Sequence, residues 1–240
     1  DRHPMWTFDG RSILFDSFDG KSREIWMVNV ADGRLTQLTR LGGLASFPSP
    51  SPDGKEFTFF FYKDDIMNLW KARIDGGDVK PLTKGLASAQ DNQCTFACHV
   101  AAWAPDSQII AYSGGDHESI WAMRRDGTDP TKVIGDDTHS HFPWFFGDGQ
   151  MGYITEHVSS TDAYTDARAY DFKTGKTIML YERMAIQGPF EWSNDGKRVL
   201  FHSPRSGNFQ IYMINLGDAE GIATLRGTPV PAQPAQPATN

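Results

Sequence analysis

The feature that most constrains the fold of this chain is an internal repeat. In each copy, a short segment that contains an aromatic residue or proline precedes an Asp-Gly turn, and an apolar run follows the turn. Clear copies are Ser51-Pro52-Asp53-Gly54 and Trp192-Ser193-Asn194-Asp195-Gly196. Five copies occur, with spacings of 44, 53, 42 and 47 residues between the aspartates at Asp9, Asp53, Asp106, Asp148 and Asp195. A recurring period of about 40–50 residues indicates that one supersecondary unit is repeated along the chain.

Each unit has the same order of strand and turn signals. An apolar run such as Phe57 to Tyr62 follows the Asp-Gly turn, and an alternating run such as Ile25 to Val30 comes next. A second turn and a short last strand with a Leu-Thr pair, such as Leu38-Thr39, complete the unit. Aromatic and β-branched residues favour strands, and Asp-Gly favours hairpin turns. The pattern predicts an all-β protein, a β-propeller of five four-stranded antiparallel blades.

The repeat also predicts the domain organisation. The propeller is expected over residues 1–226, with blades at about 1–43, 44–93, 94–140, 141–187 and 188–226. Residues 227–240 hold four prolines and no charged or aromatic side chain, so we expect a flexible Pro/Ala-rich tail there.

The anchors and the Leu-Thr pairs downstream of them resemble the PD40, or TolB-like, WD40-type repeat. The resemblance extends from Pro4 to about Leu225, and it departs from the pattern at Phe145-Phe146-Gly147 and at Ser107, which stands in place of Gly. It implies a β-propeller that is usually exported, often periplasmic, and often a docking platform for proteins. The TolB domain itself resembles six blades, whereas five units are visible here.

Net charge and hydropathy argue against nucleic-acid binding and against a membrane-spanning helix. The chain has 23 Lys and Arg against 30 Asp and Glu, a net charge of -7, whereas nucleic-acid binding needs basic clusters against phosphates. Hydrophobic residues make up 39% of the chain, and no stretch approaches the roughly 18 consecutive apolar residues of a membrane helix. We therefore expect no nucleic-acid partner and no membrane span.

The two cysteines form the sharpest motif, Cys94-Thr95-Phe96-Ala97-Cys98-His99. It is one residue longer than the Cys-x-x-Cys-His attachment site of haem c, in which two thioethers hold the porphyrin and the histidine binds iron. His139 and His141 are then candidates for the distal iron ligand. A disulfide in a small loop of an exported protein, or a pair of free thiols, also explains the cysteines, so haem c stays one of several interpretations.

Three histidines recur shortly before an aromatic residue at the start of an innermost strand. They are His3, His99 and His141, ahead of Trp6, Trp103 and Trp144. Innermost strands line the central channel of a propeller, so these imidazoles are candidate ligands of a divalent metal, in an arrangement similar to that of some propeller-type polysaccharide lyases. A histidine that merely caps a strand end is the alternative interpretation.

The function we expect is that of an exported, periplasmic or extracellular scaffold without enzymatic activity. It would dock protein partners, or serve as an accessory subunit, through the interblade loops around Lys84 to His99 and Asp136 to His141. One alternative is a haem-bearing electron-transfer subunit attached through Cys94, Cys98 and His99. A second is a metal-assisted polysaccharide lyase or hydrolase that uses the channel histidines. No catalytic residue can be assigned from the sequence.

Overall fold

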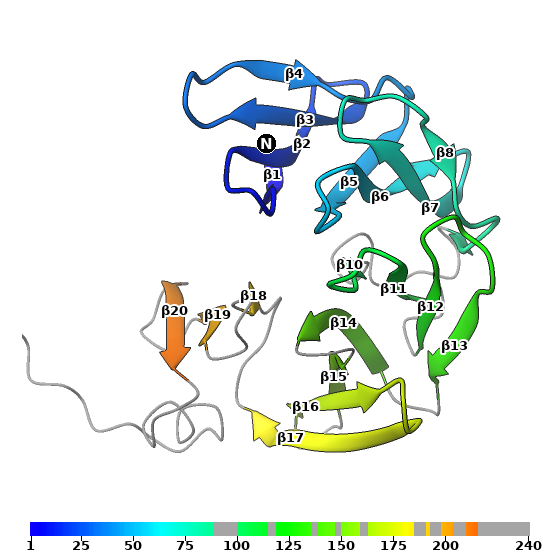
Figure 1. Cartoon of the computed structure of the whole chain (residues 1–240), viewed down its shortest axis with the longest axis vertical. Coiled ribbons are helices and arrows are strands. Elements are labelled where there is room, and N and C mark those ends of the chain that lie inside the picture. Colours follow the sequence, from blue (N-terminus) through cyan, green and yellow to red (C-terminus); the bar gives the residue numbers. More distant parts are fainter. Residues whose placement is uncertain are drawn as a thin grey trace, which may run out of the picture.

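The computed structural model describes residues 1–88, 100–114, 119–135, 139–146, 150–158, 163–184, 191–192, 198–203 and 210–215. Within these ranges the regular secondary structure consists of β-strands, with no helix. This confirms the all-β prediction. The strands follow one another as antiparallel meanders, and Figure 1 shows these sheets set around a central space with the first strand of each on the inner side.

The predicted four-stranded unit occurs four times among the described strands, twice within one nine-stranded sheet and once in each of two four-stranded sheets. Blade one is β1 (Arg2–Trp6), β2 (Ser12–Phe18), β3 (Arg23–Asn29) and β4 (Leu35–Gln37). Blade two is β5 (Leu44–Pro50), β6 (Glu56–Lys63), β7 (Ile66–Arg73) and β8 (Lys80–Pro81), and β9 (Ala87–Ser88) also pairs with β7. Blade three is β10 (Ala101–Trp103), β11 (Ile109–Ser113), β12 (Ile120–Arg124) and β13 (Thr131–Ile134). Blade four is β14 (His139–Phe146), β15 (Gln150–Val158), β16 (Ala163–Asp171) and β17 (Lys176–Met184).

The fifth unit is represented by the C-terminal sheet, which comprises β18 (Glu191–Trp192), β19 (Arg198–Ser203) and β20 (Gln210–Asn215). Its described part has three strands, so the count of five complete blades stays a prediction. The predicted tail at 227–240 lies outside the described residues.

The clusters of buried apolar side chains lie between successive blades, and each cluster combines residues of two blades. Leu14 and Ile25 of blade one pack in one cluster with Phe57 and Phe59 of blade two, and all four are fully buried. Similar clusters join blade two to blade three and blade three to blade four. Because full burial of such a side chain contributes about 1.5–3 kcal/mol, the blade-to-blade interfaces are the main apolar core of this fold.

The Asp-Gly anchor forms the same turn in successive blades. The side chains of Asp9, Asp53 and Asp106 each accept a hydrogen bond from the backbone N–H two residues later. Gly10 and Gly54 adopt positive φ angles of 68°, which glycine tolerates. Ser107 takes the equivalent conformation with φ at 60°. Its hydroxyl accepts a hydrogen bond from the N–H of Asp53 in blade two at 3.0 Å, so the departure from Gly supplies a link between blades.

The Leu-Thr pair connects the last strand of a blade to its third strand. In blade one, the Thr39 hydroxyl accepts a hydrogen bond from the N–H of Ile25 at 2.8 Å and donates one to Glu24 at 2.6 Å. Glu24 in turn accepts from the N–H groups of Leu41 and Gly42 at the passage to blade two. Thr83 repeats this arrangement in blade two, where it pairs with the N–H of Leu69.

A bulge interrupts the innermost strand at one place in three blades. His3, Phe47 and Phe142 each precede a proline and have φ angles of 49°, 56° and 53°, and the pairing register shifts beside each of them. A residue before proline normally favours extended backbone, so these positions are strained and depend on the surrounding packing. The bulge therefore changes the register in which the start of each innermost strand pairs with the second strand.

Candidate functional site

The two ends of the blades differ in chemistry. We call the end with the Asp-Gly turns the turn end. We call the opposite end, where the first strands begin and the second strands finish, the interblade end, because the chain passes from blade to blade there. His3 and His141 lie at the interblade end, near the starts of β1 and β14.

His3 belongs to a partly buried cluster shared by blades one and two. Its Nδ1 lies 2.6 Å from the carboxylate of Asp16, which is fully buried. The imidazole stacks on Phe47 with 3.8 Å between the ring centroids, and the N–H of Phe47 donates to Asp16 at 3.3 Å. Arg23 adds a positive charge 3.5 Å from the same carboxylate. The cluster therefore holds a carboxylate, an imidazole, a guanidinium and an aromatic ring in fixed positions.

His141 lies at the same end of blade four, near the start of β14. It is buried, and its Nε2 lies 3.2 Å from a carboxylate oxygen of Glu156 in β15. This contact with His141 lowers the pKa of Glu156 from its ordinary value, against the opposing effect of burial. His139 is exposed at the first position of the same strand. In the same blade, His157 and Arg168 both contact the buried carboxylate of Asp166, at 2.9 and 3.2 Å.

Exposed apolar side chains accompany these polar groups at the interblade end. Phe18 ends β2 and is about half exposed, with the Arg23 guanidinium carbon 6.0 Å from its ring centroid. Ile66 begins β7 and is also about half exposed. The tight turn before it holds Asp64 and Asp65 in left-handed backbone conformations, and Asp65 accepts a hydrogen bond from Tyr62. The interblade end thus combines apolar, acidic and basic groups that are accessible to a partner.

The predicted haem site is not described. Cys94, Cys98 and His99 lie outside the described residues, so the structure places only the candidate distal ligands, His139 and His141. Of these, His141 is engaged with Glu156. The haem and disulfide interpretations both stay predictions.

The predicted metal site is described only for His3 and His141. Each lies against its own carboxylate, and their positions relative to the bulge differ, because His3 is the bulged residue whereas His141 precedes the bulged Phe142. Within the described ranges, no group of three or more His, Cys, Asp and Glu side chains is arranged to hold a metal ion. Since His99 lies outside those ranges, the three-histidine site stays a prediction.

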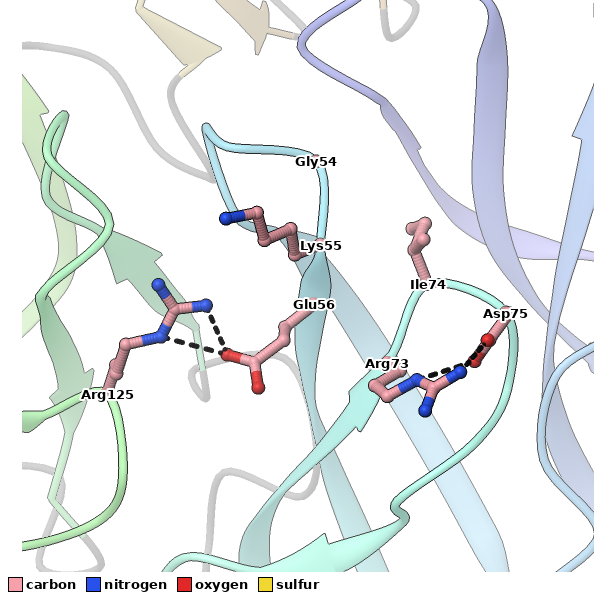
Figure 2. A pocket seen from close by; sticks show the side chains of 7 residues that line it. All are labelled: Gly54, Lys55, Glu56, Arg73, Ile74, Asp75 and Arg125. Atoms are coloured by element: carbon pink, nitrogen blue, oxygen red, sulfur yellow. Dashed lines mark hydrogen bonds and ion pairs between the residues drawn. The ribbon is translucent and has the colours of Figure 1, made fainter.

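A second candidate is a shallow depression of about 440 Å³ at the turn end, between blades two and three. Its lining consists of Gly54, Lys55, Glu56, Arg73, Ile74, Asp75 and Arg125. Figure 2 shows Arg125 pointing across from blade three to Glu56, while Arg73 turns toward Asp75 of its own blade.

Charges in this depression are satisfied by one another. Arg125 donates to Glu56 at 2.7 Å and to Asp53 at 3.1 Å, and Lys71, which is almost fully buried, lies 3.0 Å from the other oxygen of Glu56. Lys71 also donates to the backbone carbonyl of Arg125 at 2.7 Å. Burial would raise the pKa of Asp53, but hydrogen bonds from Ser51, Lys55 and Arg125 outweigh it and lower that pKa. We interpret this site as a structural junction between blades.

Sequence reasoning did not identify Arg125, Glu56 or Lys71. The signal that the sequence offered was the position of Arg125 within the repeat. Arg125 follows the third strand of its blade, as Val30 does in blade one and Ile74 in blade two, and each of the three donates its backbone N–H to the first turn of its own blade. A charged residue at an otherwise apolar position of a repeat indicates a polar contact with a neighbouring unit.

Comparisons with known proteins agree with this architecture. No family model matches the chain. TolB of the Tol-Pal system from Francisella tularensis subsp. tularensis (strain WY96-3418) is 34% identical over 82 residues, which cover 33% of this chain and 19% of that protein. The structure of TolB from Acinetobacter baumannii matches with a TM-score of 0.71 at 19% identity, over 90% of this chain and 51% of that one. A TolB-type structure from Agrobacterium tumefaciens matches with a TM-score of 0.64 at 18% identity, over 89% of this chain and 73% of that one.

The repeated four-stranded sheets and these structural matches define the fold as a β-propeller. The chain spans about half of the Acinetobacter protein to which it is similar. Its blades are of the TolB-like type, which confirms the resemblance inferred from the Asp-Gly anchors. The described part of the chain contains no helix whose length and apolarity would suit it to crossing a membrane.

Proposed function

We propose that this chain is an exported, periplasmic docking propeller that binds a protein partner at its interblade end and has no enzymatic activity. The observation that carries the proposal is the pair of half-exposed apolar side chains, Phe18 and Ile66, at the same end as the His3 cluster. Protein interfaces use aromatic, apolar and arginine side chains as anchors, surrounded by polar groups. Phe18 with Arg23 above it fits that description.

The partner's chemistry follows from the charges around this surface. The turn tips next to Phe18 and Ile66 carry Asp19, Asp64 and Asp65, all exposed. A partner segment with an apolar side chain flanked by lysine or arginine would satisfy both features. Parts of the two interblade segments that the sequence analysis selected lie at this end, because Ala87 and Ser88 pair with Met67 and Ile66, and His139 begins β14. Residues 89–99 and 136–138 of these segments lie outside the described residues.

Two further considerations support docking. The Francisella relative is named as a protein of the Tol-Pal system, and a TolB-like resemblance implies an exported platform for other proteins. The blade core also suits this role, because adjacent blades share buried clusters that hold the loops on a rigid support.

Site-specific photocrosslinking in cells of the source organism tests this proposal. A photoreactive phenylalanine analogue at Phe18 or at Ile66 is expected to give a discrete protein adduct, identified by mass spectrometry. The matched control is the same analogue at Lys55, an exposed position at the turn end. Adducts in equal yield from all three positions, or from none, would contradict a docking surface at the interblade end. Charge reversal at Asp64 and Asp65 should reduce the Phe18 adduct if the partner is basic.

A further inference from the structure

The junction between blades three and four differs from the two junctions before it in one repeated contact. In blades two and three, the glycine of the second turn lies against the leucine of the preceding blade's Leu-Thr pair. A Cβ added to Gly76 would lie 2.8 Å from the carbonyl oxygen of Leu38, and one added to Gly127 would lie 3.2 Å from a methyl carbon of Leu82. The turn of one blade therefore closes directly on the outer part of the blade before it.

Blade four does not make this contact within the described residues. Ile134 ends the outer strand of blade three at the place of those leucines, because it lies opposite the residue that precedes the third-strand tryptophan. Gly175 is the glycine of the second turn in blade four. Apart from its chain neighbours, the described atoms that a Cβ at Gly175 would meet within 4 Å are limited to the Tyr170 hydroxyl, 3.8 Å away in the same blade. The turn of blade four therefore does not close on blade three.

Apolar side chains of blade four are exposed beside this junction. Phe172 lies in the same turn and is 38% exposed, and its ring contacts are Phe145 and Tyr170 of its own blade, with 6.0 and 5.1 Å between ring centroids. Met179 in β17 is 45% exposed. It pairs with Arg168, on the side of the sheet where Tyr170 packs against the cluster shared with blade three. These exposed groups therefore lie on the side of blade four that faces blade three.

The same turn position is covered at the earlier junctions. Ile74 packs against the cluster shared by blades one and two, and Arg125 donates to Glu56 across the junction of blades two and three. Like Phe172, both residues directly follow the third strand of their blade. The apolar group left accessible at the junction of blades three and four, here called the seam surface, consists of the half-buried Ile134 and Tyr170 and the exposed Phe172 and Met179. An exposed apolar patch with a polar border is typical of an interaction site.

Two lysines border the seam surface. Lys173 follows Phe172 in the turn and Lys176 begins β17, and both side chains are exposed. Within the described part of the chain, neither lysine forms an ion pair. The neighbouring carboxylate of Asp171 is engaged in the turn itself, where it accepts hydrogen bonds from the N–H groups of Lys173 and Thr174. Positive charge therefore lies beside exposed apolar side chains, in a chain whose net charge is -7.

We propose that the seam surface docks an extended segment of a protein partner in which an aromatic or branched apolar side chain lies next to aspartate or glutamate. The apolar side chain packs against Phe172 and Ile134, in the place that a glycine turn fills at the earlier junctions. The acidic residue pairs with Lys173 or Lys176, since complementary charge at the border of an interface selects the partner. The interblade end carries acidic turn tips instead, so one propeller would hold two different partners. This inference does not rest on docking at the interblade end.

Binding of defined peptides to the full chain, measured by fluorescence anisotropy, tests the proposal. Two labelled peptides share a phenylalanine-leucine centre, which is flanked by aspartate in one and by lysine in the other. The aspartate peptide should bind. Lys173→Glu combined with Lys176→Glu should weaken its binding by about tenfold or more and make the lysine peptide the better ligand. Lys55→Glu reverses a charge at an exposed turn-end position of blade two and, as the matched control, should leave both affinities unchanged. Binding of neither peptide, equal affinity for both, or an equal effect of Lys55→Glu would overturn the proposal.

Photocrosslinking in cells locates the surface and reports the chemistry of its occupant. A photoreactive phenylalanine analogue at Phe172 should give an adduct whose crosslinked segment, sequenced by mass spectrometry, carries aspartate or glutamate beside an apolar residue. Lys173→Glu with Lys176→Glu should reduce this adduct and leave the adduct from Phe18 at the interblade end unchanged. Failure to form the Phe172 adduct, or an adduct with a basic segment or with a second copy of this chain, would refute the inference. Failure to form the Phe18 adduct alone would instead refute docking at the interblade end.

Discussion

The guanidinium of Arg125 lies 2.7 Å from the carboxylate of Glu56, across the boundary between two blades and 69 residues apart in the sequence. Arg125 also contacts Asp53, and its guanidinium carbon lies 5.9 Å from the ring centroid of Trp103. One side chain therefore connects the turn of blade two to the innermost strand of blade three.

Arg125→Met should destabilise the protein by about 2 kcal/mol. Losing one partner of a fully buried ion pair costs about 3–5 kcal/mol, and the cost is lower here because the Arg125–Glu56 pair is only partly buried and Lys71 still faces Glu56. Urea unfolding measures the change. Arg73→Met is the control, since its ion pair with Asp75 is more than half exposed and exposed ion pairs contribute little to stability. Equal losses for the two variants would contradict a specific role of Arg125 at the junction.

Gly152→Ala should destabilise blade four by about 3 kcal/mol, because an added Cβ would overlap the indole ring of Trp144. The pairing of Trp144 with Gly152 places the indole directly over the glycine. Thermal unfolding of Gly152→Ala, Trp144→Leu and the double variant forms a thermodynamic cycle. The double variant should lose less stability than the sum of the single losses, whereas strict additivity would argue against this clash.

Thr39→Val should cost about 2–3 kcal/mol. The replacement keeps the shape but leaves the N–H of Ile25 and the carboxylate of Glu24 without their hydroxyl partner in a buried place. Thr83→Val is the matched variant in blade two and should cost about 1 kcal/mol, because its site is only partly buried and its acceptor is the neutral Asn68. Chemical denaturation of both variants checks the order, and a larger loss for Thr83→Val would refute it.

Stability should fall as the solution is acidified below about pH 5, in part through Asp53. The folded-state pKa of Asp53 is lowered from its ordinary value of 3.8. A carboxylate with a lowered folded pKa stabilises the fold above its unfolded-state pKa, and this contribution is lost as the pH falls through the folded value. The unfolding midpoint of Asp53→Asn should therefore be lower at neutral pH and change less between about pH 5 and pH 3. An unchanged slope would show that Asp53 does not contribute.

The repeat predicted the strand order because each unit carries its own turn chemistry. Asp9, Asp53 and Asp106 start the same turn by the same local hydrogen bond, so sequence spacing alone located these turns. The Leu-Thr pairs were recognised as a pattern, and the structure adds their hydrogen bonds to the third strand. These features are local, which is why a single sequence reveals them.

Features that depend on a neighbouring blade could not be predicted in the same way. The partner of Arg125 is fixed by how two blades lie against each other, and no local pattern encodes that contact. The bulges at His3, Phe47 and Phe142 had a sequence signal, a repeated residue-proline pair, but their left-handed backbone is opposite to the usual preference before proline. His3 is itself the bulged residue whereas His141 precedes the bulged Phe142, so equal spacing before an aromatic did not make His3 and His141 equivalent.

The parallel pairing of Arg23 in β3 with Leu44 in β5 joins blades one and two into a single hydrogen-bonded sheet of nine strands, whereas blades three and four are separate sheets. Exchange of amide protons with solvent reports the units in which a protein opens. Residues 1–88 should accordingly open together as one cooperative unit. Mechanical extension of the chain would then release the first two blades in one event.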